Sequence, residues 1–181
     1  MLNRVHLALI AMGGVTTSSC GIFDFEVGYL IPTQTVSGNA VAAAAGQLIP
    51  AGSFFPNPFS FTINLEQETS ARDTGPASKV WLKSLSLSLD SASIEPNFDW
   101  LDELHVYVES TKAGTTLSKQ EIALLAPVAK GLRTLQLTMR ANVDLLPYIN
   151  EGNKVTSQAT ARSPAQDVVF SGAAVFRVEV L

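Results

Sequence analysis

Histidine offers the most versatile acid–base chemistry near neutral pH, and this chain holds two, His6 and His105. His6 stands in an apolar amino-terminal stretch, so His105 is the imidazole left for a folded domain. A zinc site built from several histidines is therefore excluded. A Ser-His-Asp triad would have to use His105, and no Gly-x-Ser-x-Gly motif supplies its serine. We expect His105 to be a solvent-facing strand residue with no catalytic part.

Carboxylates form two groups, one from Asp90 to Glu95 and one made of Asp99, Asp102 and Glu103. Two carboxylates on opposed loops could provide acid–base catalysis of the glycosidase type. Acidic loops can also bind calcium, but positions 92 and 94 carry no carboxylate and no glycine follows Asp90. We expect solvated loops, with no catalytic residue, metal or cofactor. A hydrolase that uses Asp99, Asp102 or Glu103 is the alternative.

The amino-acid composition limits the kinds of partner that this protein is expected to bind. The formal net charge is −4, and 46% of the residues are hydrophobic against 15% charged. Enough apolar surface is present to form a core, which argues against a disordered chain. Nothing resembles a run of lysines and arginines or a glycine-rich phosphate loop. We therefore expect no nucleic-acid partner.

The elements that must position these side chains are strands, because hydrophobic residues recur at every second position. Such alternation predicts an all-β fold, an antiparallel β-sandwich of about seven strands that is immunoglobulin-like or related. A change of phase between Leu82 and Leu85 predicts a β-bulge near Lys83 and Ser84. The seven segments cover 23–31, 59–65, 80–89, 104–108, 134–139, 155–162 and 168–180.

Helical patterning is sparse. Lys119 to Leu125 and Val143 to Ile149 could each form a helical turn or two, limited by Pro127 and interrupted by Pro147. The sequence therefore predicts few short helical turns within a single sandwich domain over residues 25–181.

An apolar connection from Asn39 to Pro58 is long for a compact domain. Its larger apolar residues allow two interpretations. The segment covers an open end of the core, or it forms a contact surface for a membrane or a partner. The candidate contact residues are Leu48, Ile49, Phe54 and Phe55.

The amino terminus carries one positive side chain, Arg4, followed by an apolar stretch from Val5 to Val15 that is too short to span a bilayer. Thr17-Ser18-Ser19-Cys20 then resembles the lipobox of bacterial lipoproteins. The resemblance implies a signal peptide over residues 1–19, acylation of Cys20 and a short tether over 20–24. It also implies a bacterial outer-membrane location on the periplasmic or surface face. An acylated Cys20 could not serve as a Cys/His nucleophile.

These patterns together predict a cell-envelope lipoprotein that acts as a non-enzymatic binding or accessory module. Its expected partners are the membrane, through the amino-terminal lipid, and an envelope protein. A carrier of lipids or other hydrophobic ligands remains a further alternative to the hydrolase. Because few residues separate Cys20 from the first strand, we expect the domain to be held close to the bilayer, with the Asn39–Pro58 loop as a possible second contact.

Overall fold

The computed structural model describes residues 23–50 and 54–181. The predicted signal peptide, the acylated Cys20 and the start of the tether lie outside the described residues. Among the described residues, no helix combines the length and the apolar character needed to cross a bilayer.

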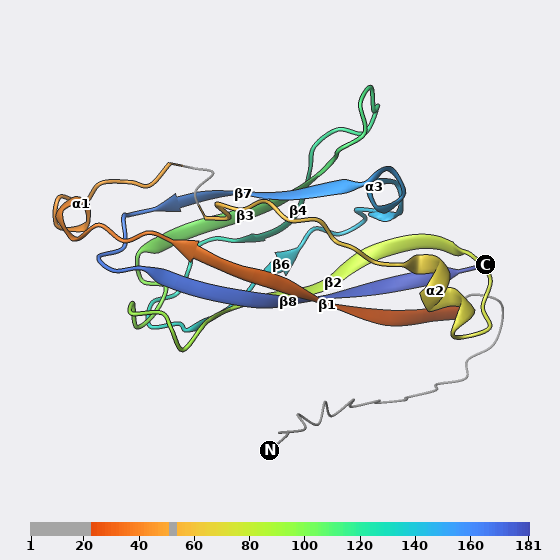
Figure 1. The fold of residues 1–181 in the computed structure, drawn as a ribbon, viewed down its shortest axis with the longest axis horizontal. Helices are drawn as coiled ribbons and strands as arrows, with labels where there is room; N and C mark the ends of the chain where they lie inside the picture. Colours follow the sequence, from red (N-terminus) through yellow and green to blue (C-terminus); the bar gives the residue numbers. More distant parts are fainter. Residues whose placement is uncertain (1–22, 51–53) are drawn as a thin grey trace, which may run out of the picture.

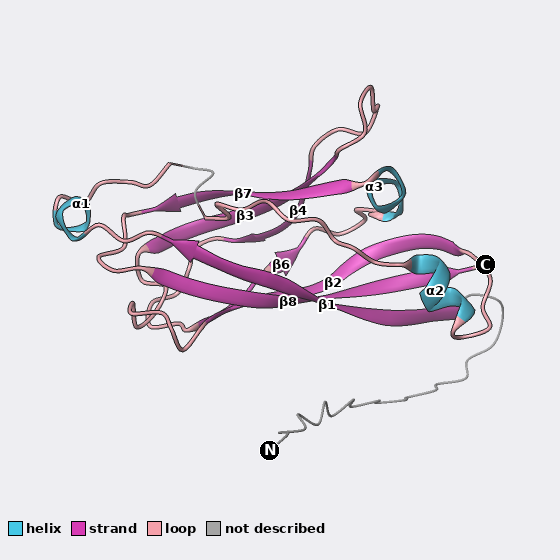
Figure 2. Ribbon diagram, viewed as in Figure 1, coloured by secondary structure: helices cyan, strands magenta, loops and turns pink. Residues whose placement is uncertain are grey.

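Two antiparallel four-stranded sheets pack face to face (Figures 1 and 2), which confirms the predicted all-β sandwich. The first sheet has the order β1 (Phe23–Val36), β8 (Val168–Val180), β2 (Ala77–Leu89), β5 (Thr134–Gln136). The second has the order β6 (Thr138–Met139), β4 (Gln120–Leu125), β3 (Leu101–Ser110), β7 (Asn153–Ala161).

The pairing follows the nested plan of a jelly roll. Strand β1 pairs with β8, β2 with β5, and β3 with β4, as in one long hairpin wrapped into two layers. In a jelly roll one more strand would pair with β7. Residues 54–64, which we call the seam segment, take the place of that strand. This segment lies beside β7 and is joined to it by a single β-bridge, between Phe59 and Val155. The structure thus identifies the predicted sandwich, immunoglobulin-like or related, as a jelly roll.

Several details read from the sequence are confirmed. The register of β2 against β8 shifts between Leu82 and Ser84, where the bulge was predicted. Strand β8 buries Val168, Phe170, Ala174, Phe176, Val178 and Val180, as the alternation requires. Small residues of β7, Ser157 and Ala161 among them, also face the core.

The prediction of a regular strand over 59–65 is wrong. Phe59 and Phe61 are buried in alternation as expected, but only Phe59 forms a bridge, and Leu65 begins helix α2 (Leu65–Ser70). The Asn64 side chain ends the extended run by accepting a hydrogen bond from the backbone N–H of Gln67 at 3.0 Å. The alternation therefore predicted correctly which side chains are buried, but it did not predict whether the segment pairs as a strand.

The prediction of helical turns over 119–125 is also wrong, because this segment contains β4. Ile122 and Ala123 are both buried since the β3–β4 register shifts here, and two consecutive apolar residues imitate a helical face. Helix α3 (Leu146–Glu151) does form, with Pro147 in its first turn instead of interrupting it. Residues 134–139 divide between the sheets, β5 in the first and β6 in the second. The remaining helix, α1, spans Ala40–Ala44.

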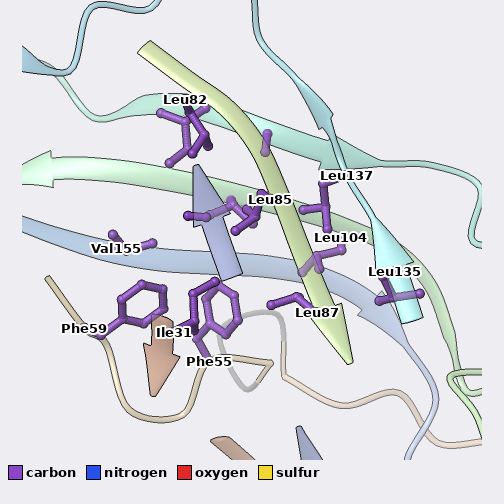
Figure 3. Packing of buried hydrophobic residues seen from close by; sticks show 14 of the residues in the cluster. Ile31, Phe55, Phe59, Leu82, Leu85, Leu87, Leu104, Leu135, Leu137 and Val155 are labelled. Carbon is purple, nitrogen blue, oxygen red and sulfur yellow. The ribbon is translucent and has the colours of Figure 1, made fainter. Parts of the chain in front are cut away.

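The core lies between the sheets and is rich in aromatic rings. Figure 3 shows Phe55, Phe59 and Ile31 close together beside Val155 of β7. Phe54 packs 4.8 Å from Phe170 between ring centroids, and Phe61 packs 4.8 Å from Phe176. The seam segment thus closes one side of the sandwich by adding its rings to the core.

Candidate functional site

The sandwich presents two opposite ends. Phe23 begins β1 opposite Val180, so the start of the first strand and Leu181 share one end with helix α2 (Figure 1). We call this the Phe23 end. Strand β1 has 14 residues, so helix α1 lies about 40 Å away along it. The apolar loop that contains α1 is therefore remote from the Phe23 end, so the expected second bilayer contact beside an anchor at Cys20 has no geometric support.

Loops 37–50, 90–97 and 163–167 meet at the end opposite Phe23, and we call them the distal tip. The backbone N–H of Asn39 donates to the Pro164 carbonyl at 2.8 Å, and that of Ile94 donates to the Asp167 carbonyl at 3.3 Å. The N–H of Ser163 donates to the Gln47 carbonyl at 2.8 Å. These bonds join the three loops directly, so the tip is preorganised.

Tip carboxylates hold the loops together. Asp90 accepts a hydrogen bond from the N–H of Ala92 at 2.9 Å, and Glu95 accepts one from the N–H of Gln166 at 2.8 Å. Asp167 accepts one from the N–H of Gly38 at 2.8 Å. An added Cβ at Gly38 would lie 2.2 Å from the Gln166 backbone, so this close crossing requires glycine. The acidic residues 90 and 95 therefore have a structural part in the loops.

Three large apolar side chains are exposed at the tip, two on loop 37–50 and one on loop 90–97. Their exposed fractions are 81% for Val41, 68% for Leu48 and 68% for Ile94. Of the four contact residues proposed from sequence, Leu48 is exposed, Ile49 is partly buried, and Phe54 and Phe55 lie in the core. Those two phenylalanines thus cover the core instead of offering a contact surface. Sequence reasoning missed Val41 and Ile94, whose only local signal was an apolar residue within a small or polar loop.

The second acidic group is spread along the chain that enters β3. The Asp99 carboxylate accepts a hydrogen bond from the N–H of Gly131 at 2.5 Å, and Lys130 Nζ lies 3.3 Å from an Asp102 oxygen. Glu103 lies farther along β3, with an oxygen 4.0 Å from His105 Nε2. These carboxylates therefore fix a loop and a strand face, each through a partner of its own.

His105 lies half-buried on the outer face of the second sheet and not in open solvent. Its Nδ1 is 3.1 Å from a Glu121 oxygen, and the other Glu121 oxygen accepts a hydrogen bond from Arg140 Nε at 2.5 Å. Partial burial raises the pKa of the Glu121 carboxyl, but the hydrogen bonds from Arg140 and His105 outweigh it, so this pKa lies below its usual range. Burial, and then the charge of Glu121, raise the pKa of neighbouring Tyr107. The cluster holds the Glu121 carboxylate between the Arg140 guanidinium and the His105 imidazole, which is the character of a structural network.

Two surface clefts complete the candidate sites. One of about 380 Å³ lies between the seam segment and the α3–β7 turn, and one of about 330 Å³ lies on the outer face of the first sheet. Within residues 23–50 and 54–181, no three His, Cys, Asp or Glu side chains gather as metal ligands.

The sequence matches no protein-family model and no curated protein. The chain is similar to several solved structures of viral proteins. The decameric BFDV capsid protein has 13% identity and a TM-score of 0.40, covering 89% of this chain and 100% of that one. The 60-mer BFDV capsid protein has 12% identity and a TM-score of 0.37, covering 91% and 95%. Mud crab tombus-like virus has 14% identity and a TM-score of 0.28, covering 94% of each chain. At these values the likeness carries no inference about function.

Proposed function

We propose that this protein is a cell-envelope lipoprotein that acts as a non-enzymatic accessory module. Cys20 anchors it in the outer membrane, and the distal tip binds an envelope protein. The observation that carries the proposal is the separation of the Phe23 end from the distal tip (Figure 1). Anchor and binding surface would then occupy opposite poles of one rigid domain.

The Phe23 end suits attachment to a bilayer. Cys20 is three positions before Phe23, so an extended chain between them reaches only about 10 Å. Two or three acyl chains on one cysteine anchor a protein stably, whereas a single chain binds only marginally. The anchored domain would therefore stand close to the bilayer, with its distal tip about 40 Å farther out if it stands upright.

The distal tip suits a protein partner. Loops carried on a rigid scaffold commonly provide binding residues, and exposed apolar side chains rimmed by polar groups mark interaction sites. Val41, Leu48 and Ile94 are the exposed apolar side chains of the tip, and the two loops that carry them are each joined to loop 163–167 by backbone hydrogen bonds. Little conformational entropy would be lost when such a surface binds.

Replacing Cys20 with Ala should abolish incorporation of labelled palmitate, because the acyl chain is attached through sulfur. The protein should also move from the membrane fraction to the soluble fraction. Cells grown with labelled palmitate, followed by purification of both forms, provide the measurement. A Ser19→Ala variant keeps the cysteine and a small neighbouring residue, and serves as the control. Equal labelling of the Cys20→Ala chain would refute lipidation at this residue.

A photo-crosslinking amino acid placed at Leu48 should capture a discrete envelope protein in intact cells. The same amino acid at Gln158, which is exposed on the outer face of the second sheet, is the matched control. Adding Val41→Asp and Ile94→Asp should reduce the Leu48 crosslink at least tenfold, since charges would replace two of the apolar contacts. Equal capture from Leu48 and Gln158 would contradict a partner at the tip.

A further inference from the structure

The outer face of the first sheet carries a cleft, lined by Trp81, Lys83 and Arg177, beside a row of uncharged residues. Gly28, Val175 and Ser84 form one row across β1, β8 and β2, because Val175 pairs with both of the others. An added Cβ on Gly28 would meet no atom within 4 Å, so space remains above this row. Leu30, with 81% of its surface exposed, rises on one side of the row.

Trp81, Lys83 and Arg177 line the cleft of about 330 Å³ on the other side. Val80, Leu82, Phe176 and Val178 are buried, so their neighbours Trp81 and Arg177 must point outward. The β-bulge adds Lys83 to the same face, because it lies between the paired residues Leu82 and Ser84. A half-buried indole therefore stands beside two cations on a surface that lies away from the core.

Ion pairs place acceptors next to these donors. Lys83 pairs with Glu26, and Arg177 pairs with Asp24, both carboxylates standing on β1. Lys79 lies 5.8 Å from the centre of the Trp81 ring and pairs in register with Glu179. Three cations thus face three anions, and the patch has no net charge.

We propose that this cleft binds a glycan, with a pyranose ring stacked on Trp81. The apolar C–H face of a pyranose matches an aromatic surface, and its vicinal hydroxyls need donors and acceptors side by side. Guanidinium and carboxylate groups offer planar pairs of donors and of acceptors, as Arg177 and Asp24 do here. Exposed ion pairs contribute little stability, so ligand hydroxyls can replace part of each pair. The patch has no net charge, which favours a sugar as its ligand, because an anionic lipid surface would attract a patch of net positive charge.

The available glycans depend on the proposed function, since a lipoprotein of the outer membrane meets two polysaccharides. Peptidoglycan strands and the lipopolysaccharide core both present pyranose rings with free hydroxyls. The test therefore uses each of them in soluble form, as oligosaccharides from digested peptidoglycan and as lipopolysaccharide core oligosaccharide. Vesicles of phosphatidylethanolamine and phosphatidylglycerol form the third arm.

The experiment is a titration of the purified full chain, followed by tryptophan fluorescence and by calorimetry. Trp100 is buried, so a ligand should change the emission of Trp81. We expect saturable binding of at least one oligosaccharide, and about tenfold weaker binding after Trp81→Ala. Arg177→Ala should weaken it similarly, with Trp81→Phe intermediate. Tyr107→Ala is the matched control, because Tyr107 lies on the outer face of the other sheet with Lys119 4.7 Å from its ring centre. Binding by this control should be unchanged, and thermal melts should show that all variants fold.

Three results would overturn the glycan site. The first is no saturable binding of either oligosaccharide. The second is binding by the folded Trp81→Ala and Arg177→Ala chains that is as tight as binding by the parent chain. The third is a change in Trp81 emission with vesicles but none with the sugars. Because the sugars are soluble, the Cys20→Ala chain should bind them as tightly as the parent. Failure of lipidation would thus remove the proposed anchoring and leave the glycan result standing.

Discussion

Phe54→Ala should lower the free energy of unfolding by about 3–5 kcal/mol, the range typical of removing a buried aromatic ring. The Phe54 side chain is fully buried although it belongs to the seam segment and not to a strand. Its ring lies 5.4 Å from Phe55, 5.9 Å from Trp100 and 4.8 Å from Phe170, measured between centroids. Truncation would leave a cavity that this tight aromatic packing could close only in part. Urea denaturation with linear extrapolation provides the measurement.

The matched control is Phe23→Ala at the exposed start of β1, which should change stability by no more than about 0.5 kcal/mol. Phe54→Leu should fall between the two, since it keeps most of the apolar contact. If Phe54→Ala and Phe23→Ala proved equally mild, the seam segment would not complete the core.

Asn153→Ala should cost about 2–3 kcal/mol through loss of buried hydrogen bonds. The Asn153 amide accepts a bond from the N–H of Phe61 at 2.7 Å and donates one to the Phe61 carbonyl at 3.1 Å. These two bonds replace the backbone ladder that a regular strand would form with β7. Alanine would leave the N–H and the carbonyl of Phe61 without partners. Urea denaturation again gives the value, and Asn57→Ala, an exposed position on the same segment, is the control.

Asn153→Asp separates the two bonds. A carboxylate still accepts from the Phe61 N–H but cannot donate to the Phe61 carbonyl. Protonation restores the donor, so the folded state should raise the pKa of this Asp above its unfolded value of about 3.9. The variant should therefore regain stability relative to the parent as the pH falls through the folded pKa. A stability difference that stays constant between pH 7 and pH 4 would contradict this account.

The sequence by itself determined most of the sandwich. Alternation in β2, β3, β7 and β8 identified the buried faces, since side chains on a strand point to opposite sides in turn. The phase change at Lys83 located the bulge in β2, because one extra residue must move all following side chains to the other face. These are local consequences of backbone geometry, and neighbouring residues suffice to show them.

Pairing and exposure depended on the tertiary structure. Residues 59–65 alternate as well as any strand. In the folded chain, however, they meet β7 through one β-bridge and through the hydrogen bonds of the Asn153 amide to Phe61, and only the tertiary structure shows this. Leu48 and Phe54 are apolar residues of one connection, but the first is exposed at the distal tip and the second is buried beside Phe170. No local pattern separates them, because burial of a loop residue is set by the distant segments that it meets.

The candidate glycan site shows the same division. The positions of Trp81 and Lys83 on one face of β2 follow from the sequence once the bulge is placed. Arg177 and Asp24 reach that face only because β8 pairs between β1 and β2. Strand order is fixed by the closure of the whole jelly roll around its core, in which chain ends far apart in sequence become neighbours. The sequence therefore determined which side chains each strand directs outward, and the tertiary structure decided which of these side chains lie next to one another.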